Sequence, residues 1–372
     1  MKKIYLDYAA TTPVKEEVVN AMLPFFESTE KHESLISKIK DDFMSILNAS
    51  TGEIIFTSSG TFSDNTLIRS LAYYQRDHGK GNQIITSTIE HPAVYKTLEK
   101  LEVEGFEVVY VPVDQSGVLE MDLFYKAISQ KTALVTIMMM NNEIGTKQPI
   151  EEIGTFLKEK ETLFHVDAVQ ALGSMKIDID SLHLDAASFS AHKIYAPKGC
   201  GALYVKNIEL LNFSHGSILE PSCEIYENIP YIVGFGKALS LSYEHFKESV
   251  SHRQVLKEKL VKGMLSLDMG IECNGLPLDE SSHPGIMNFY IPQMDGDSLV
   301  INYDFNGIAI SSGSACSSGA LSASHVLKAI GFNDQKAKRC IRITVGDNTS
   351  MDDIAHVIAV TEEMLKGLKY VK

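Results

Sequence analysis

The feature that most constrains the fold is a regular alternation of strand-length and helix-length segments between residues 83 and 190. The predicted strands have apolar residues on both faces, which is typical of strands covered on both sides. Alternation of such strands with helices indicates a mainly parallel sheet that is covered by helices on both sides, an α/β fold. The predicted strands are Gln83–Ser87, Glu107–Val111, Ala133–Met140, Thr162–Val166 and Ala186–Ser190, and the predicted helices are Ala93–Glu104, Met121–Ile128, Ile150–Lys160 and a short one after Asp167.

The segments before and after this alternation suggest a second, smaller unit. A long helical stretch, about Gly234–Leu267, leads into a different pattern of strands and helices, which is typical of a small α+β domain. We therefore predict a large domain over residues 13–250 and a small domain formed by residues 1–12 and 251–372. The other predicted elements are strands at Ile4–Asp7, Ile54–Phe56, Ile286–Ile291, Ile308–Ser311 and Arg339–Val345, and helices at Val14–Phe26, Leu35–Leu47, Asp64–Asp77, Ser322–Ile330, from Asp297 and from Met351.

Composition excludes several classes of protein. The chain of 372 residues has 34 Lys and Arg against 48 Asp and Glu, and this net charge of −14 argues against nucleic acid as a main partner. The N-terminus lacks the apolar core of a signal peptide, and no apolar run approaches membrane-spanning length. Five cysteines without a CxxC pair suggest reduced thiols rather than disulfides or a zinc or other metal site. We therefore expect a cytoplasmic protein.

Polar residues gather where the predicted strands end. In a parallel sheet, ligands bind outside the carboxyl ends of the strands. Glu90 and His91, the run Asn141–Glu143, Asp167, and the group Ser190–Lys193 all stand at such ends. The sequence therefore predicts a binding site at this edge of the sheet.

Lys193 is the most informative of these residues. It follows an apolar strand in the stretch S-F-S-A-H-K-I-Y-A-P-K-G, where a solvated ammonium group is unexpected. Desolvation lowers the pKa of a lysine, and a neutral amine can form a Schiff base with an aldehyde cofactor. A surface lysine in a loop is the alternative for any single lysine.

Three further residues fit such a cofactor site, each with a structural alternative. Asp167 could hold the protonated ring nitrogen of a pyridine, or it could be a helix N-cap. His91 could stack on an aromatic ring and relay protons, or it could be a buried structural histidine. Arg342, in the apolar strand C-I-R-I-T-V, could clamp a carboxylate, or it could form a structural salt bridge.

Two small-residue segments complete the pattern. The turn T-S-S-G-T-F-S-D-N between a strand and a helix can cradle a phosphate at the positive end of the helix, although this signal alone is weak. Cys316 lies in S-S-G-S-A-C-S-S-G, a run with no side chains to form a core, so we expect a mobile, exposed loop. A thiol there is suited to be a nucleophile, whereas the other four cysteines are expected to be packing residues.

The sequence resembles the NifS/IscS-type cysteine desulfurases, which are pyridoxal-phosphate enzymes of the class V aminotransferase family. The resemblance covers nearly the whole chain, and its motifs occur in the family's order. The motifs are Y-L-D-Y-A-A-T-T-P, E-H-P-A-V, N-N-E-I-G, H-V-D-A-V-Q, S-F-S-A-H-K-I-Y-A-P-K-G, S-S-G-S-A-C-S-S-G and S-H-V-L-K-A-I-G. This resemblance implies the fold type I of pyridoxal-phosphate enzymes, with a mainly parallel seven-stranded sheet, and a homodimer with each site near the subunit interface.

The resemblance also implies a role for each site residue. Lys193 would bind pyridoxal 5'-phosphate covalently and shuttle protons, and Cys316 would take sulfur from L-cysteine as a persulfide, leaving L-alanine. A sulfur-acceptor protein would then receive the sulfur. Asp167 would pair with the ring nitrogen of the cofactor, Gln170 would bind the ring hydroxyl, and His91 would stack on the ring. The phosphate would be held by Thr61, Ser190 and His192, and the substrate would be positioned by Asn142 and Arg342.

The chain departs from the family at three places. The usual G-N-P-S-S segment after the first helix is replaced by F-E-S-T-E-K-H-E-S, which is shorter by roughly a dozen residues. Phe62 stands where the phosphate turn usually has glutamate. Residues 223–228, from Cys223 through Tyr226 to Asn228, replace R-x-G-T-E-N, whose threonine reaches the phosphate in the partner subunit. Loss of one hydrogen bond to a charged phosphate costs about 1.5–3 kcal/mol, which weakens cofactor binding about tenfold or more.

Three functions are compatible with these features. The first is an active cysteine desulfurase that supplies sulfur for Fe–S cluster assembly or for thiolation of tRNA or a cofactor. The second is a degenerate relative that keeps the fold and acts as a scaffold or binding protein, which the altered segments favour. The third is a related lyase that acts on selenocysteine or cystine, against which Cys316 argues because selenium release depends less on an enzyme thiol.

Overall fold

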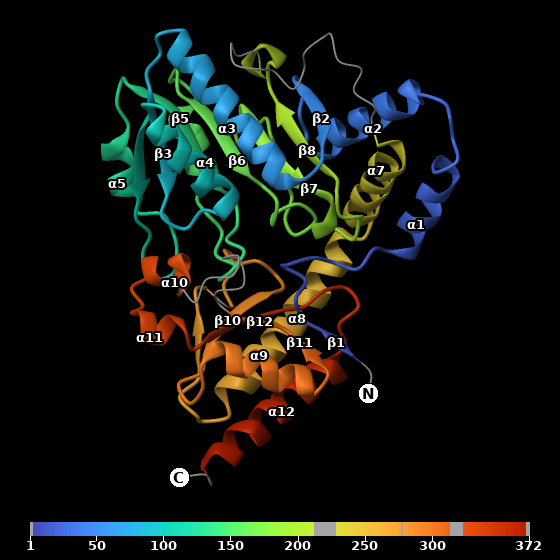
Figure 1. Cartoon of the computed structure of the whole chain (residues 1–372), viewed down its shortest axis with the longest axis vertical. Coiled ribbons are helices and arrows are strands. Elements are labelled where there is room, and N and C mark those ends of the chain that lie inside the picture. The colour runs from blue at the N-terminus through green and yellow to red at the C-terminus, as the bar shows by residue number, and fades with distance from the viewer. Residues whose placement is uncertain (1–2, 212–227, 277, 313–322, 370–372) are drawn as a thin grey trace.

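A seven-stranded sheet forms the centre of the larger part of the protein (Figure 1). The computed structural model describes residues 3–211, 228–276, 278–312 and 323–369. Strands β3 to β7 run parallel to their sheet neighbours among themselves, whereas β8 runs antiparallel to both β7 and β2. The strand order is β2(Glu53–Thr57), β8(Gly201–Val205), β7(Ala186–Ser190), β6(Leu163–Asp167), β5(Thr132–Met138), β3(Gln83–Ser87), β4(Glu107–Val111). The predicted α/β fold is confirmed.

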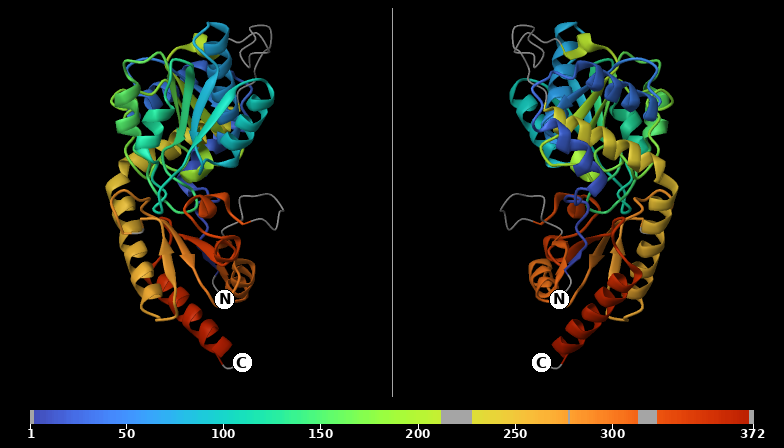
Figure 2. Two further views of the ribbon diagram at one scale, coloured as in Figure 1. Left: turned by 90° about the vertical axis from the view of Figure 1, so that its left-hand side faces the viewer. Right: turned by 90° about the vertical axis from the view of Figure 1, so that its right-hand side faces the viewer.

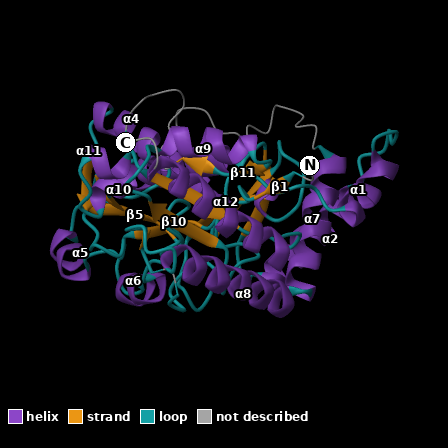
Figure 3. Ribbon diagram, turned by 90° about the horizontal axis from the view of Figure 1, so that it is seen from below, coloured by secondary structure: helices purple, strands orange, loops and turns teal. Residues whose placement is uncertain are grey.

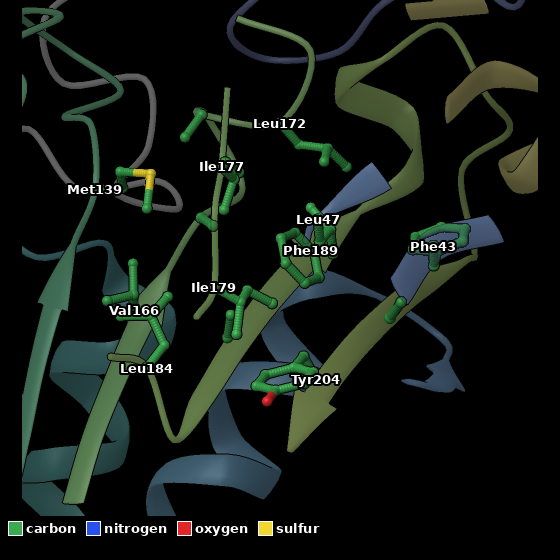
Figure 4. Packing of buried hydrophobic residues seen from close by; sticks show 14 of the residues in the cluster. Phe43, Leu47, Met139, Val166, Leu172, Ile177, Ile179, Leu184, Phe189 and Tyr204 are labelled. Carbon is green, nitrogen blue, oxygen red and sulfur yellow. The ribbon is translucent and has the colours of Figure 1, made fainter. Parts of the chain in front are cut away.

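Helices cover both faces of this sheet (Figure 2). One face packs against α3(Gly60–Asp77) and α4(Pro92–Val103), and their apolar residues form a core with those of the strands. The apolar side chains of the other face pack against further helices, and part of this core is drawn in Figure 4. The helices on that face are α1(Glu16–Met22), α2(Glu33–Ile46), α5(Met121–Ala127), α6(Ile150–Leu157) and α7(Ile229–Glu244), with the 3-10 helix η1(Leu23–Phe25) after α1.

A second, four-stranded sheet lies in the smaller part, seen from below in Figure 3. Its order is β12(Ser311–Ser312), β13(Cys340–Thr344), β10(Ile286–Tyr290), β9(Glu272–Asn274), and β1(Ile4–Tyr5) pairs separately with β11(Ile308–Ala309). Its apolar residues form a core of their own with α8 and α12. The helices here are α8(Phe246–Leu265), α9(Gly296–Phe305), α10(His325–Ala329), α11(Asp334–Ala337) and α12(Met351–Lys369). None of the described helices is long and apolar enough to cross a membrane.

Several local predictions were wrong. No helix follows Asp167, where residues 169–174 form turns instead. The long helix at 234–267 is two helices that meet at His245, whose backbone angles (φ −97°, ψ 15°) leave the helical region. Strands β8 and β9 were not predicted. The division of the chain into domains at residues 12 and 250 stays a prediction.

The shortened segment after the first helix has a compact conformation of its own. His32, which precedes α2, adopts a left-handed backbone (φ 49°), and its Nε2 lies 2.5 Å from the hydroxyl of Ser28. The His32 ring also packs edge-on against Phe25, with ring centroids 5.1 Å apart. These local contacts allow the chain to pass from η1 to α2 in a few residues.

Candidate active site

One cavity of about 330 Å³ lies where the strands of the large sheet end. It is lined by eight of the ten residues predicted for the site. These are Thr61, His91, Asn142, Asp167, Gln170, Ser190, His192 and Lys193. They come from α3, from the loops after β3 and β5, from β6 and the turn after it, and from β7 and the 3-10 helix η2(Ala191–Lys193) that follows it. The tertiary structure therefore brings together residues that are more than 130 positions apart in the sequence.

The side chain of Lys193 points to the N-terminal segment of the chain. Its amine donates hydrogen bonds to the carbonyl oxygens of Ala9 (2.5 Å) and Ala10 (2.9 Å). The amide of Gln170 donates to the same carbonyl of Ala9, at 3.0 Å. The segment that follows β1 therefore forms one wall of the cavity, and it holds the Lys193 amine in place.

Asp167 is the last residue of β6 and is almost fully buried. Burial raises the pKa of its carboxyl group to about 6, and the backbone N–H of Val169 (2.9 Å from Oδ1) and the charge of Lys193 partly offset this effect. A carboxylate in this setting is suited to accept a hydrogen bond from a cationic ring nitrogen, because the cation would restore the lost solvation.

His91 caps the N-terminus of α4. Its Nδ1 accepts a hydrogen bond from the backbone N–H of Ala93 (3.1 Å), so in the neutral ring the proton is on Nε2. Burial, together with the nearby positive charge of Lys193, lowers the pKa of His91 to about 4. The imidazole is therefore neutral at physiological pH, as a ring that stacks on an aromatic cofactor should be.

The predicted phosphate turn is the beginning of α3. The helix starts four residues earlier than predicted, because the hydroxyl of Ser59 accepts a hydrogen bond from the backbone N–H of Phe62 (3.1 Å) and caps it. A Cβ atom on Gly60 would lie 2.8 Å from the Val169 side chain and 3.1 Å from Ser190. Only glycine lets the helix start approach this closely. Ser59, Gly60 and Thr61 thus line the cavity at the N-terminus of α3, where backbone N–H groups can bind an anion.

Arg342 and Asn142 connect the cavity to the smaller part. Arg342, on β13, is buried and does not itself line the cavity. Its guanidinium group donates to the carbonyl oxygen of Asn142 (3.0 Å), pairs with the carboxylate of Asp7 (2.8 Å), and contacts the hydroxyl of Ser311 (3.4 Å). Arg342 therefore forms a structural salt bridge with Asp7. Because it also contacts Asn142, which lines the cavity, its position is compatible with a carboxylate clamp as well.

Two of the predicted features lie outside the described residues. They are the proposed nucleophile Cys316 and residues 223–227 of the altered segment. Asn228, the last residue of that segment, precedes α7. Of the remaining cysteines, Cys200 and Cys340 are buried and Cys273 is partly buried, and burial raises the pKa of each thiol to about 12.

Other residues of the site were not identified from the sequence. The carbonyl groups of Ala9 and Ala10 are backbone atoms, and no side-chain pattern identifies them. Asp64, which the sequence indicated only as the first residue of a helix, also lines the cavity and is buried in α3. A carboxylate at a buried position of an amphipathic helix is the signal that could have found it.

These residues fit pyridoxal phosphate. The capped helix start provides anion-binding N–H groups, Asp167 is a buried acceptor for a ring nitrogen, and the amine of Lys193 lies in the same cavity. The covered, mainly parallel sheet with this site at its carboxyl edge defines a protein of the pyridoxal-phosphate fold type I. The profile of the family described as Aminotransferase class-V matches residues 4–357.

Similarity to known proteins extends over the whole chain. This chain is 40% identical to a protein of Clostridium botulinum named "Cysteine desulfurase IscS", and the match covers 98% of this chain and 95% of that protein. A solved structure titled "NIFS-LIKE PROTEIN" matches with a TM-score of 0.87 and 33% identity. The match covers 98% of this chain and 99% of the chain in that structure. Another solved structure, titled "SspA in complex with cysteine", matches with a TM-score of 0.78 and 32% identity. That match covers 93% of this chain and 100% of the chain in that structure. The chain belongs to the class-V aminotransferases and, among them, to the NifS/IscS-type cysteine desulfurases.

Proposed function

We propose that this protein is a pyridoxal-phosphate-dependent cysteine desulfurase, which converts L-cysteine to L-alanine and passes the sulfur on as a persulfide. The observation that carries the proposal is the convergence of eight independently placed motif residues on one cavity, with the Lys193 amine and the Asp167 carboxyl group both in it. The similarity to proteins named as cysteine desulfurases supports the same function.

Each cavity residue would hold a defined part of the cofactor. When bound, pyridoxal phosphate withdraws electrons from the substrate carbon atoms. The start of α3 with Thr61, together with Ser190 and His192, would bind the phosphate group, and burial lowers the pKa of His192 to about 4, so that it acts as a neutral hydrogen-bonding group. Asp167 would pair with the ring nitrogen, Gln170 with the ring hydroxyl, and the neutral His91 would cover the ring face.

The substrate would bind between the cavity and Arg342. The guanidinium group of Arg342 presents a planar pair of donors that matches a carboxylate, and Asn142 joins it to the cavity. Lys193 would move protons at the substrate carbon atoms, because its amine lies inside the cavity. The carbonyl oxygens of Ala9 and Ala10 orient that amine before the substrate arrives.

Sulfur transfer would require Cys316. Its thiolate attacks the substrate sulfur, an S–S bond forms, and the C–S bond breaks with its electrons remaining on carbon. That carbon takes up a proton, so that alanine is released and the sulfur stays on Cys316 as a persulfide. An acceptor protein for Fe–S cluster assembly or for thiolation would then remove the sulfur. We place this chemistry in the cytoplasm, where thiols stay reduced.

We further propose that the protein is a homodimer. Val19, Leu23 and Phe26 follow one another at helical spacing from α1 through η1 to the residue after it, and each is between 41% and 58% exposed. Phe62, beside the phosphate turn, is also exposed at 41%. We propose that these exposed apolar side chains form part of the subunit interface, and Phe62 follows Thr61, which lines the cavity.

An absorption spectrum with and without L-cysteine tests the function. We expect a yellow protein whose visible band shifts on addition of cysteine, together with production of alanine and of a protein persulfide. The Cys316→Ala variant should keep the band and lose the persulfide, whereas Cys200→Ala, which removes a buried thiol, should keep both. A protein that stays colourless with added pyridoxal phosphate would contradict the proposal and favour a scaffold.

A further inference from the structure

A second buried carboxyl group lines the cavity beside Asp167. Asp64 projects from the first turns of α3, is 1% exposed, and its Oδ1 atom has no hydrogen-bond partner among the described residues. A buried carboxylate oxygen without a partner is costly in its charged form, whereas a protonated carboxyl group avoids most of that cost. The environment of Asp64 therefore decides which form the protein contains.

The cation that lines the cavity together with Asp64 is Lys193, and its charge lowers the pKa of Asp167. The other titratable groups around Asp64 are Asp167 and His165 from β6, Glu90 from the loop after β3 and His192 from η2. His165 Nε2 lies 3.8 Å from Asp64 Oδ1, but the His165 ring is fully buried, and burial lowers its pKa to about 3. The ring is therefore neutral and cannot compensate a charge on Asp64.

A hydrogen-bonded network fixes the neutral His165 ring beneath the cavity. Its Nδ1 lies 2.8 Å from the Thr136 hydroxyl and its Nε2 lies 2.9 Å from the Ser188 hydroxyl. Ser188 is the neighbour of Asp167 across β6 and β7, so the network ends beside both carboxyl groups. Two carboxyl groups in one buried site cannot both ionise easily, because like charges repel strongly where water is excluded.

We propose that Asp64 is held as the neutral acid, so that Asp167 is the carboxyl group of this pair that carries a charge. The inference rests on the proposed function, because it assigns Asp64 as a positioning residue for Asp167, which would pair with the ring nitrogen of the cofactor. One negative charge then matches one positive ring, and Asp64 supplies a hydroxyl group to the cavity instead of a second anion. Burial, followed by the charge of Asp167, raises the pKa of Asp64 and outweighs a hydrogen bond with Ser188 that lowers it, in agreement with this assignment.

Infrared difference spectroscopy of the full-length protein at pH 7.5 tests the assignment directly. The difference between the wild type and Asp64→Asn should contain the C=O stretching band of a carboxylic acid, which shifts in heavy water. The matched control is Asp178→Asn, which removes a partly exposed carboxylate whose pKa is lowered by hydrogen bonds and should remove carboxylate bands only. If the Asp64→Asn difference spectrum instead shows the loss of carboxylate bands, the proposal is overturned. If the Asp64→Asn variant does not fold, Asp64→Ser is used in its place.

The bound cofactor gives a second readout. If Asp64 is neutral, Asp64→Asn leaves the pH midpoint of the visible cofactor band unchanged, because one uncharged polar group replaces another. If Asp64 is ionised, the loss of a nearby charge moves that midpoint by about one pH unit or more, which would overturn the proposal. A wild-type protein that does not bind pyridoxal phosphate would refute the proposed function, whereas the infrared measurement on the cofactor-free protein would still decide the state of Asp64.

Discussion

At the scale of single residues, the position of Arg342 explains why a lysine could not replace it. The guanidinium group reaches the backbone of Asn142 with one nitrogen and the carboxylate of Asp7 with the other. Its planar fork can thus hold the margin of the cavity and still present donors to a carboxylate, which a single ammonium group cannot do.

Replacement of Arg342 by lysine should therefore impair substrate binding. We expect the KM for L-cysteine to rise about tenfold or more, with an unchanged spectrum of the bound cofactor, because a charged hydrogen bond is worth about 1.5–3 kcal/mol. Steady-state kinetics measure this effect. Arg339→Lys is the matched control, since Arg339 is exposed and donates to the carbonyl of Pro292. Equal KM values for both variants would exclude Arg342 from carboxylate binding.

At the scale of elements, the start of α3 contributes both to stability and to the cavity. Ser59 caps the helix, and the residues that follow line the cavity at the carboxyl end of β7. Asp295 caps α9 in the same way, through a hydrogen bond from the N–H of Ser298 (3.0 Å), but α9 does not contribute to the cavity.

Variants of these two capping residues distinguish an effect on stability from an effect on cofactor binding. Ser59→Ala and Asp295→Ala should each lower the free energy of unfolding by about 1 kcal/mol. Only Ser59→Ala should also weaken the binding of pyridoxal phosphate, because a frayed first turn no longer holds its N–H groups toward the phosphate. Chemical unfolding and titration of the cofactor-free protein measure the two effects. A similar loss of affinity in Asp295→Ala would show that the effect is a general destabilisation.

At the scale of the whole molecule, buried carboxyl groups make the folded state sensitive to pH. Glu90 is fully buried, and desolvation raises its pKa to about 8, although the Ser87 hydroxyl and the Met138 N–H both donate to it. The folded protein therefore keeps a proton on Glu90 between pH 4.5 and 8, where the unfolded chain has lost it. Its stability must decrease as the pH rises through this interval.

Glu90→Gln should remove this dependence. The glutamine amide mimics the protonated acid, so the variant should gain stability over the wild type at pH 8, on the order of a few kcal/mol, and this gain should shrink toward pH 4.5. Urea unfolding at several pH values measures the difference. Glu53→Gln, at an exposed position of β2, is the control and should show no such trend. A gain in Glu90→Gln that is the same at all pH values would refute the assignment.

The proposed dimer is a second property of the whole molecule. Phe26→Asp, in the exposed apolar row of α1 and η1, should weaken association so that the monomer is populated at micromolar concentration. Phe305→Asp, at an 82% exposed phenylalanine of α9, should leave the dimer intact. Light scattering after gel filtration measures the masses. Dissociation by Phe305→Asp alone would place the interface on the smaller part of the protein.

The sequence by itself determined the fold class, the family and most of the cavity. Apolar strands alternating with helices require a covered parallel sheet, and in such a sheet the residues after successive strands must meet at one edge, so His91, Asp167 and Lys193 could be predicted together. The family motifs extended this set to Thr61 and Gln170.

Only the tertiary structure decided the features that depend on contacts between distant segments. The short strand β8 has an ordinary composition, and it forms because β2 and β7 flank it. The wall made by the carbonyls of Ala9 and Ala10 exists because the N-terminal segment crosses the cavity. The burial of Asp64 beside Asp167 arises from the packing of α3 against β6 and β7. Backbone acceptors, strand neighbours and desolvation are properties of the folded chain, and no local pattern of residues encodes them.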